Sequence, residues 1–170
     1  YLVFKNGEVV SVLWFELLPG LEIKFRIEAL GVLFSLVASF LWPVTTLYSI
    51  GYMRAHKEPN QTQFYAYFAI AISCVMGAAF ADNLFTLFIF YELLTLSTYP
   101  LVAHAGTESA KRGARTYIAL LLGTSFAFFL LAMIGTWLLS GTLDFKQGGV
   151  FSEDTSSLTV AVLLVLFIFG

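Results

Sequence analysis

The chain has 170 residues, of which 59% are apolar, 17% aromatic and only 12% charged. Soluble globular domains carry about 25% charged residues, so this composition excludes a water-soluble enzyme or binding domain. Nine basic and eleven acidic side chains leave a net charge of −2, which argues against nucleic acid as a partner. The lone cysteine, Cys74, excludes an intrachain disulfide. The composition predicts an integral membrane protein.

Residues 1–28 differ from the rest of the chain and are expected to form a small extramembrane β element. Tyr1 to Lys5 and Glu8 to Trp14 flank Asn6-Gly7, a pair that favours a type I′ hairpin turn. Further on, residues 21–27 alternate apolar and charged side chains, which is typical of a half-buried strand. We expect this element to lie on the membrane surface and to lead into the first span.

Residues 29–170 are expected to form a transmembrane domain. A bilayer core about 30 Å thick needs about 20 apolar residues as a helix, and four runs meet that length. The predicted helices are 29–53, 64–81, 84–103, 117–139 and a truncated one from 158. The last run reaches only about 20 Å by Gly170, so we expect an internal piece of a longer protein. The predicted fold class is an all-α polytopic membrane protein, a transmembrane helix bundle with the β element at its N-terminal end.

The positions of the basic residues orient the predicted bundle. The loops after the first and third spans fall on the same side of the membrane, and together they hold most of the basic residues outside the β element: Arg54, Lys57, Lys111, Arg112 and Arg115. Positively charged loops face the cytoplasm. We therefore expect a multi-pass protein of the cytoplasmic (inner) membrane, with the β element outside.

Small and capping residues are expected to shape the bundle. Asp82-Asn83 lies in a short turn between two spans, and both residue types favour the N-cap of the next helix. Gly77, Gly123 and Gly135 are small residues within spans, and small residues let membrane helices approach closely.

Glu92 is the one charged residue within the third predicted span. A carboxylate near the bilayer midplane costs about 2.5–3.5 kcal/mol on insertion scales, and intramembrane carboxylates usually serve a function. Thr95 and Tyr99 follow at +3 and +7 and lie on the same helical face. Two interpretations compete: Glu92 binds and releases protons or pairs with a cation in an ion path, or it is a protonated contact that holds helices together.

Two further polar residues are weaker candidates. His104, at the loop end of the third span, could relay protons inward, although a histidine there is also a common helix terminator. Arg115 lies just before the fourth span and could reach inward or simply set topology. The sequence has no zinc spacing, phosphate loop or Ser-His-Asp set, so we expect no metal, no cofactor and no catalytic chemistry in this chain.

Three motifs resemble one known family, the antiporter-like subunits shared by respiratory complex I, Mrp-type cation/proton antiporters and membrane-bound hydrogenases. Leu47–Met53 is similar to the Y-S-x-x-Y-M end of the family's third helix. Asn83–Leu101 is similar to its fifth helix, with an aromatic-Glu pair followed by S-x-Y-x-L. Glu108–Tyr117 resembles its basic turn into helix six.

The resemblance implies a longer protein of about fourteen helices with inverted repeats and interrupted helices. It also implies that Glu92 is the family's essential glutamate, which exchanges a proton with a lysine on helix seven. We expect that lysine within about five residues after Gly170, followed by a helix break. One departure is Arg115-Thr116, where the family often has lysine, because arginine stays charged and would act as a fixed charge.

These observations predict a proton-translocating membrane subunit of a multisubunit complex, and in an antiporter the second ion would be Na⁺. An alternative is a proton-pumping subunit of an NADH–quinone oxidoreductase or hydrogenase complex, whose redox chemistry lies in partner subunits. Another is a membrane scaffold with no ion path. The expected partners are other membrane subunits and the lipid bilayer.

Overall fold

The computed structural model describes residues 10–18, 20–152 and 155–170. It confirms a mainly helical membrane protein with a small sheet near its N-terminus. The elements in chain order are β1 (Ser11–Leu18), β2 (Leu21–Arg26), α2 (Ala29–Ala55), α3 (Gln61–Ala79), α4 (Leu84–Val102), α5 (Glu108–Thr124), η1 (Ser125–Phe129), α6 (Leu130–Ser140) and α7 (Ser157–Phe169).

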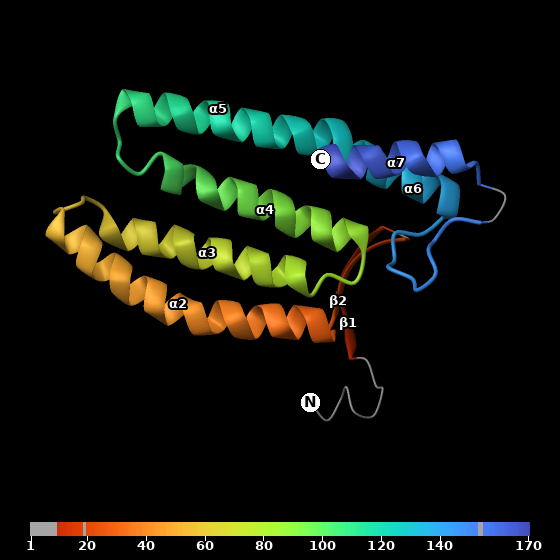
Figure 1. The fold of residues 1–170 in the computed structure, drawn as a ribbon, viewed down its shortest axis with the longest axis horizontal. Helices are drawn as coiled ribbons and strands as arrows, with labels where there is room; N and C mark the ends of the chain where they lie inside the picture. The colour runs from red at the N-terminus through yellow and green to blue at the C-terminus, as the bar shows by residue number, and fades with distance from the viewer. Residues whose placement is uncertain (1–9, 19, 153–154) are drawn as a thin grey trace.

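The long helices lie side by side in chain order, with the sheet at one end of the bundle (Figure 1). Within the described residues, four helices are long and apolar enough to cross a membrane: 29–55, 61–79, 84–102 and 108–140. Each corresponds to one predicted span. Figure 1 places α4 between α3 and α5, so its side chains meet helices on both sides.

The fourth of these helices is longer than the predicted span 117–139. It starts at Glu108 because the Thr107 hydroxyl accepts a hydrogen bond from the amide of Ala110 at 3.1 Å and so caps the helix. Its middle, Ser125–Phe129, is a π-helical segment. It ends at Gly141, whose φ of 69° lies in the left-handed region that glycine adopts without strain.

The sheet is an antiparallel pair of β1 and β2, in which Ser11 pairs with Arg26 and Leu18 with Leu21. The predicted strand over 21–27 is confirmed as β2. The predicted hairpin around Asn6-Gly7 lies outside the described residues. In the described part, β1 runs on past Trp14 to Leu18, and two register irregularities accompany that extension.

Hydrogen bonds join β2 both to the turn between α3 and α4 and to the first turn of α4. The amide of Arg26 donates to the Phe80 carbonyl at 2.8 Å, and that of Asp82 donates to the Lys24 carbonyl at 3.0 Å. The Thr86 hydroxyl accepts from the amide of Lys24 at 2.9 Å. Thr86 is fully buried, so this contact excludes water.

Asn83 confirms the predicted helix cap. Its side-chain oxygen accepts from the amide of Thr86 at 2.7 Å, while its side-chain nitrogen donates to the Glu22 carbonyl at 2.8 Å. Asp82 instead faces Arg26, with Oδ1 2.8 Å from the guanidinium Nε. On the other side of the turn, the amide of Leu84 donates to the Leu143 carbonyl at 2.9 Å, so the turn is held from two directions.

Two of the three predicted small-residue contacts are confirmed. A Cβ on Gly77 would lie 2.2 Å from the ring of Phe90, and one on Gly135 would lie 2.7 Å from Leu163. Both glycines therefore let neighbouring helices approach more closely than any larger residue would allow. Within the described residues, a Cβ on Gly123 would meet nothing within 4 Å, so close approach at that position stays a prediction.

Candidate functional site

Glu92 lies in the middle of α4, the helix with neighbours on both sides. Both of its carboxylate oxygens are buried, and neither has a hydrogen-bond partner among the described residues. A buried polar group without a partner costs about 1–3 kcal/mol, and a charged one costs more. The carboxyl group therefore requires a proton, water or a cation that this part of the chain does not supply.

A polar seam follows Glu92 along α4. Thr95 is buried, and its carbonyl accepts a hydrogen bond from the Thr98 hydroxyl at 2.8 Å. That hydroxyl also lies 3.2 Å from the hydroxyl of Tyr117 on α5. Tyr99 is half-buried one helical turn beyond Thr95. The seam thus leads from Glu92 toward the loop end of α4.

The C-terminal end of α7 lies beside the residue that precedes Glu92. The Tyr91 hydroxyl donates to the Gly170 carbonyl at 3.3 Å. The ring of Tyr91 also stacks on Phe129 of η1, with ring centres 6.2 Å apart, and Phe129 packs edge-on against Phe167 of α7. The end of α7 is therefore at the same depth in the bundle as Glu92.

His104 borders a cavity of about 270 Å³ at the loop end of α3 and α4. Its ring packs edge-on against Phe64, with ring centres 5.2 Å apart. Its Nε2 atom is buried and has no hydrogen-bond partner among the described residues. Tyr99 borders the same cavity, so the structure brings two of the predicted polar residues together.

Arg115 is the predicted site residue that the structure does not bring together with the others. Its side chain is exposed on α5, and it forms no ion pair with any residue that the structure describes. The buried position on this turn of the helix is Ala114. Arg115 therefore does not join Glu92 or His104 within this chain.

Sequence reasoning missed the contribution of α3 to the cavity. Gln63 and Tyr67 border it together with Asn60, the N-cap of α3. Their spacing of four places Gln63 and Tyr67 on one helical face, and that spacing is the signal that could have identified them.

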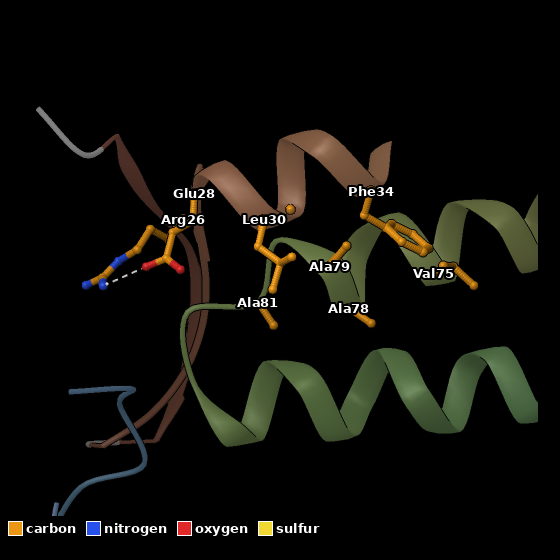
Figure 2. A pocket seen from close by; sticks show the side chains of 9 residues that line it. Arg26, Glu28, Leu30, Phe34, Val75, Ala78, Ala79 and Ala81 are labelled. Atoms are coloured by element: carbon orange, nitrogen blue, oxygen red, sulfur yellow. Dashed lines mark hydrogen bonds and ion pairs between the residues drawn. The ribbon is translucent and has the colours of Figure 1, made fainter. Parts of the chain in front are cut away.

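A second cavity, of about 510 Å³, lies at the opposite end of the bundle and contains none of the predicted site residues. Figure 2 shows Arg26 and Glu28 at its sheet end and apolar side chains of α2 and α3 along its walls. Beside it, burial raises the pKa of the Asp82 carboxyl above its ordinary value, against the opposing effect of the Arg26 guanidinium. Its charged groups are paired with one another, unlike Glu92.

No group of three or more His, Cys, Asp or Glu side chains that could hold a metal ion occurs among the described residues. The site described above contains carboxyl, imidazole and hydroxyl groups. These groups bind, donate and accept protons.

Comparison with known proteins gives one family match and several relatives. The family model described as "NADH:quinone oxidoreductase/Mrp antiporter, TM" matches residues 81–170. NAD(P)H-quinone oxidoreductase chain 5 of Picosynechococcus sp. is 29% identical over 158 residues, which cover 88% of this chain and 23% of the relative. NADH-quinone oxidoreductase subunit N of Campylobacter jejuni is 29% identical over 149 residues, covering 85% and 32%.

A third relative is Na(+)/H(+) antiporter subunit A1 of Staphylococcus aureus, 32% identical over 84 residues, which cover 49% of this chain and 10% of the relative. The chain spans between 10% and 32% of the length of these three relatives. Among solved structures, a chain of the archaeal membrane-bound sulfane sulfur reductase, a respiratory membrane complex, matches with a TM-score of 0.74 and 26% identity. That match covers 99% of this chain and 34% of the other.

Proposed function

Because the chain belongs to the transmembrane family of NADH:quinone oxidoreductase and the Mrp antiporter, we propose that it is part of a proton-translocating membrane subunit. The relatives named above are subunits of an antiporter or of quinone oxidoreductases. By analogy, the other membrane subunits of one such complex are the partners. The ion is H⁺, exchanged for Na⁺ if the complex is an antiporter.

The observation that carries this proposal is the state of Glu92. Its two oxygens are buried inside a membrane-spanning helix and have no partner among the described residues. A structural carboxyl that only holds helices together would be expected to have a hydrogen-bonding partner on a neighbouring helix. A carboxyl group that takes up and releases a proton needs instead partners that can approach it and move away again.

The position of α7 supports a partner that arrives from that helix. The hydrogen bond from Tyr91 to Gly170 brings the end of α7 to the depth of Glu92. A lysine soon after Gly170, as predicted above, would approach the carboxylate and stabilise its charged form. The residues following Gly170 in the complete sequence test this step directly.

The two kinds of complex differ in their energy source: an ion gradient drives an antiporter, whereas redox chemistry in partner subunits drives the other complex. We propose that the subunit resides in the cytoplasmic membrane, with the basic loops that follow α2 and α4 facing the cytoplasm. The genes neighbouring this one would distinguish an antiporter from a redox-driven complex, since only the latter is accompanied by redox subunits.

The test is Glu92→Gln in the complete protein within its complex. Gln keeps the size of the side chain but cannot take up a proton at physiological pH. We expect proton transport into membrane vesicles, followed with a pH-sensitive dye, to fall to background while the complex still assembles. Glu108→Gln is the matched control because the Glu108 side chain is 85% exposed in the first turn of α5, and this variant should transport normally.

Two results would contradict the proposal. Unchanged transport in Glu92→Gln would remove Glu92 from the ion path. Loss of assembly, with normal transport per assembled complex, would identify Glu92 as a structural contact and would favour the scaffold.

A further inference from the structure

The cavity of about 510 Å³ at the sheet end of the bundle lies between α2 and α3, and we call it the sheet-end groove (Figure 2). Leu30 and Phe34 of α2 form one wall, and Val75, Ala78 and Ala79 of α3 form the other. Leu30 is 78% exposed and Phe34 is 44% exposed, so the groove is open to the surroundings of the bundle. Exposed apolar surface of this kind marks a place where an apolar partner binds.

The groove lies at the end of two membrane spans. The span of α2 begins at Ala29, and that of α3 ends at Ala79. Leu30 and Phe34 are about 6 Å apart along the axis of α2, at 1.5 Å per residue. The groove therefore lies just inside one face of the bilayer, where the headgroups meet the first carbons of the acyl chains. The apolar molecules present at this depth are lipids.

The mouth of the groove has charges of both signs. Nη1 of Arg26 lies 3.2 Å from Oε1 of Glu28, and their side chains are 34% and 59% exposed. The Nε atom of Arg26 pairs with the buried Asp82, which fixes the guanidinium in place. An arginine has five N–H donors, so Arg26 can also donate to a phosphate oxygen. The Glu28 carboxylate can accept hydrogen bonds from an ammonium group.

These charges select one class of phospholipid. Sites for anionic lipids are clusters of Lys and Arg. Among the described residues that line the groove, in contrast, the basic side chain is Arg26, and two carboxylates, those of Glu28 and Asp82, pair with it. A headgroup with a net negative charge would be repelled by these carboxylates. The ammonium group of phosphatidylcholine has no N–H to donate. Phosphatidylethanolamine carries both a phosphate and an ammonium group that donates hydrogen bonds.

We propose that the sheet-end groove binds one molecule of phosphatidylethanolamine. Its phosphate accepts a hydrogen bond from the guanidinium of Arg26, and its ammonium group donates to the carboxylate of Glu28. The upper part of one acyl chain lies between Leu30 of α2 and Ala78 of α3. The lipid thereby fills the space between these two helices at the sheet end. This inference concerns a different part of the molecule from Glu92 and does not depend on the proposed function.

The test is photolabelling of the complete complex in lipid discs made of equal parts of phosphatidylethanolamine, phosphatidylcholine and phosphatidylglycerol. In each experiment one of the three lipids carries a diazirine near the start of an acyl chain, and mass spectrometry identifies the labelled peptides. We expect the phosphatidylethanolamine probe to label residues 29–34 and 75–79 about two- to fivefold more than the other two probes. This is the range expected for one exposed charge pair.

Two variants test the two parts of the site. Glu28→Gln should reduce labelling of the groove by phosphatidylethanolamine about two- to fivefold, while Glu108→Gln, at the other end of the bundle, should not. Ala78→Leu should reduce labelling at least about fivefold, because the larger side chain occupies the space of the acyl chain. Ala66→Leu is its matched control, since Ala66 is exposed on the same helix and is not among the residues that line the groove.

Three outcomes would overturn the proposal. Equal labelling of the groove by all three probes would mean that it holds ordinary boundary lipid. Absence of labelling by every probe would mean that another segment of the complete chain or another subunit covers the groove. Native labelling in both Glu28→Gln and Ala78→Leu would mean that the labelled lipid binds elsewhere on these helices.

Discussion

Asn83 offers the sharpest test of how the extramembrane end of the bundle is held together. Its side chain is 3% exposed and makes two hydrogen bonds, one to the amide of Thr86 and one to the carbonyl of Glu22. Asn83→Ala removes both. Loss of a helix cap costs about 1 kcal/mol, and loss of the second hydrogen bond costs about 1 kcal/mol more.

The total loss of about 2 kcal/mol of stability should make the region around Asn83 open more often, without unfolding the whole protein. Since about 1.4 kcal/mol is a factor of ten, the affected amides should exchange hydrogen about 30-fold faster. The amides to follow are those of Lys24 and Arg26 in β2, which donate to Thr86 and to the Phe80 carbonyl. Hydrogen exchange of the complete protein, read by mass spectrometry over residues 21–26, measures the change.

Ser156→Ala is the matched control. Ser156 is the N-cap residue of α7, but its side chain makes no capping hydrogen bond. Its removal should leave exchange unchanged in both α7 and β2. Exchange in β2 of the Asn83→Ala protein within about threefold of the native rate would refute the reasoning, because it would mean that Asn83 does not hold the strand to the helix.

Two further variants test the packing and the charge at this end of the bundle. Gly77→Ala places a Cβ 2.2 Å from the ring of Phe90 and should lower the free energy of unfolding by about 1–3 kcal/mol. Denaturant titration measures this change. Gly113→Ala is the control, because its added Cβ would lie in open space and should not lower the free energy of unfolding. Burial raises the pKa of Asp82 above its ordinary 3.8, so its contribution to stability is greatest below that pH and is lost as pH rises through the raised pKa. Asp82→Asn should therefore flatten the fall in unfolding free energy between acid and neutral pH, and an unaltered slope would contradict the assignment.

The helices and the family could be predicted from the sequence because each is indicated by residues that lie close together in the chain. Long apolar runs fix the spans, and the aromatic-Glu motif within 83–101 identifies the family that the comparison confirms. The cap at Asn83 was predictable for the same reason, since it depends on a residue and the helix that immediately follows.

The sheet and the cavity were less predictable because their contacts join distant segments. Thr86 meets the amide of Lys24 across a separation of 62 residues, and no local pattern announces such a pair. The π-helical segment at 125–129 opens with Ser125, and Phe129 within it packs against Tyr91 of α4 and Phe167 of α7, which are distant in the sequence. The roles of Glu92 and His104 in proton transport stay predictions, because these roles depend on the binding of protons and water.

The hydrogen bonds around Asn83 have a mechanical consequence for α4. They attach the first turn of α4 to β2, and the hydrogen bond from the amide of Leu84 to the Leu143 carbonyl holds the same turn from the other side. Glu92 lies eight positions beyond Leu84, a rigid arm of about 12 Å at 1.5 Å per residue. In contrast, among the described residues the hydrogen bond that joins α4 to the end of α7 is the 3.3 Å bond from the Tyr91 hydroxyl to the carbonyl of Gly170, the C-cap residue of α7. If Glu92 pairs with a cation, as proposed above, we therefore expect the cation to move toward Glu92 while Glu92 stays in place.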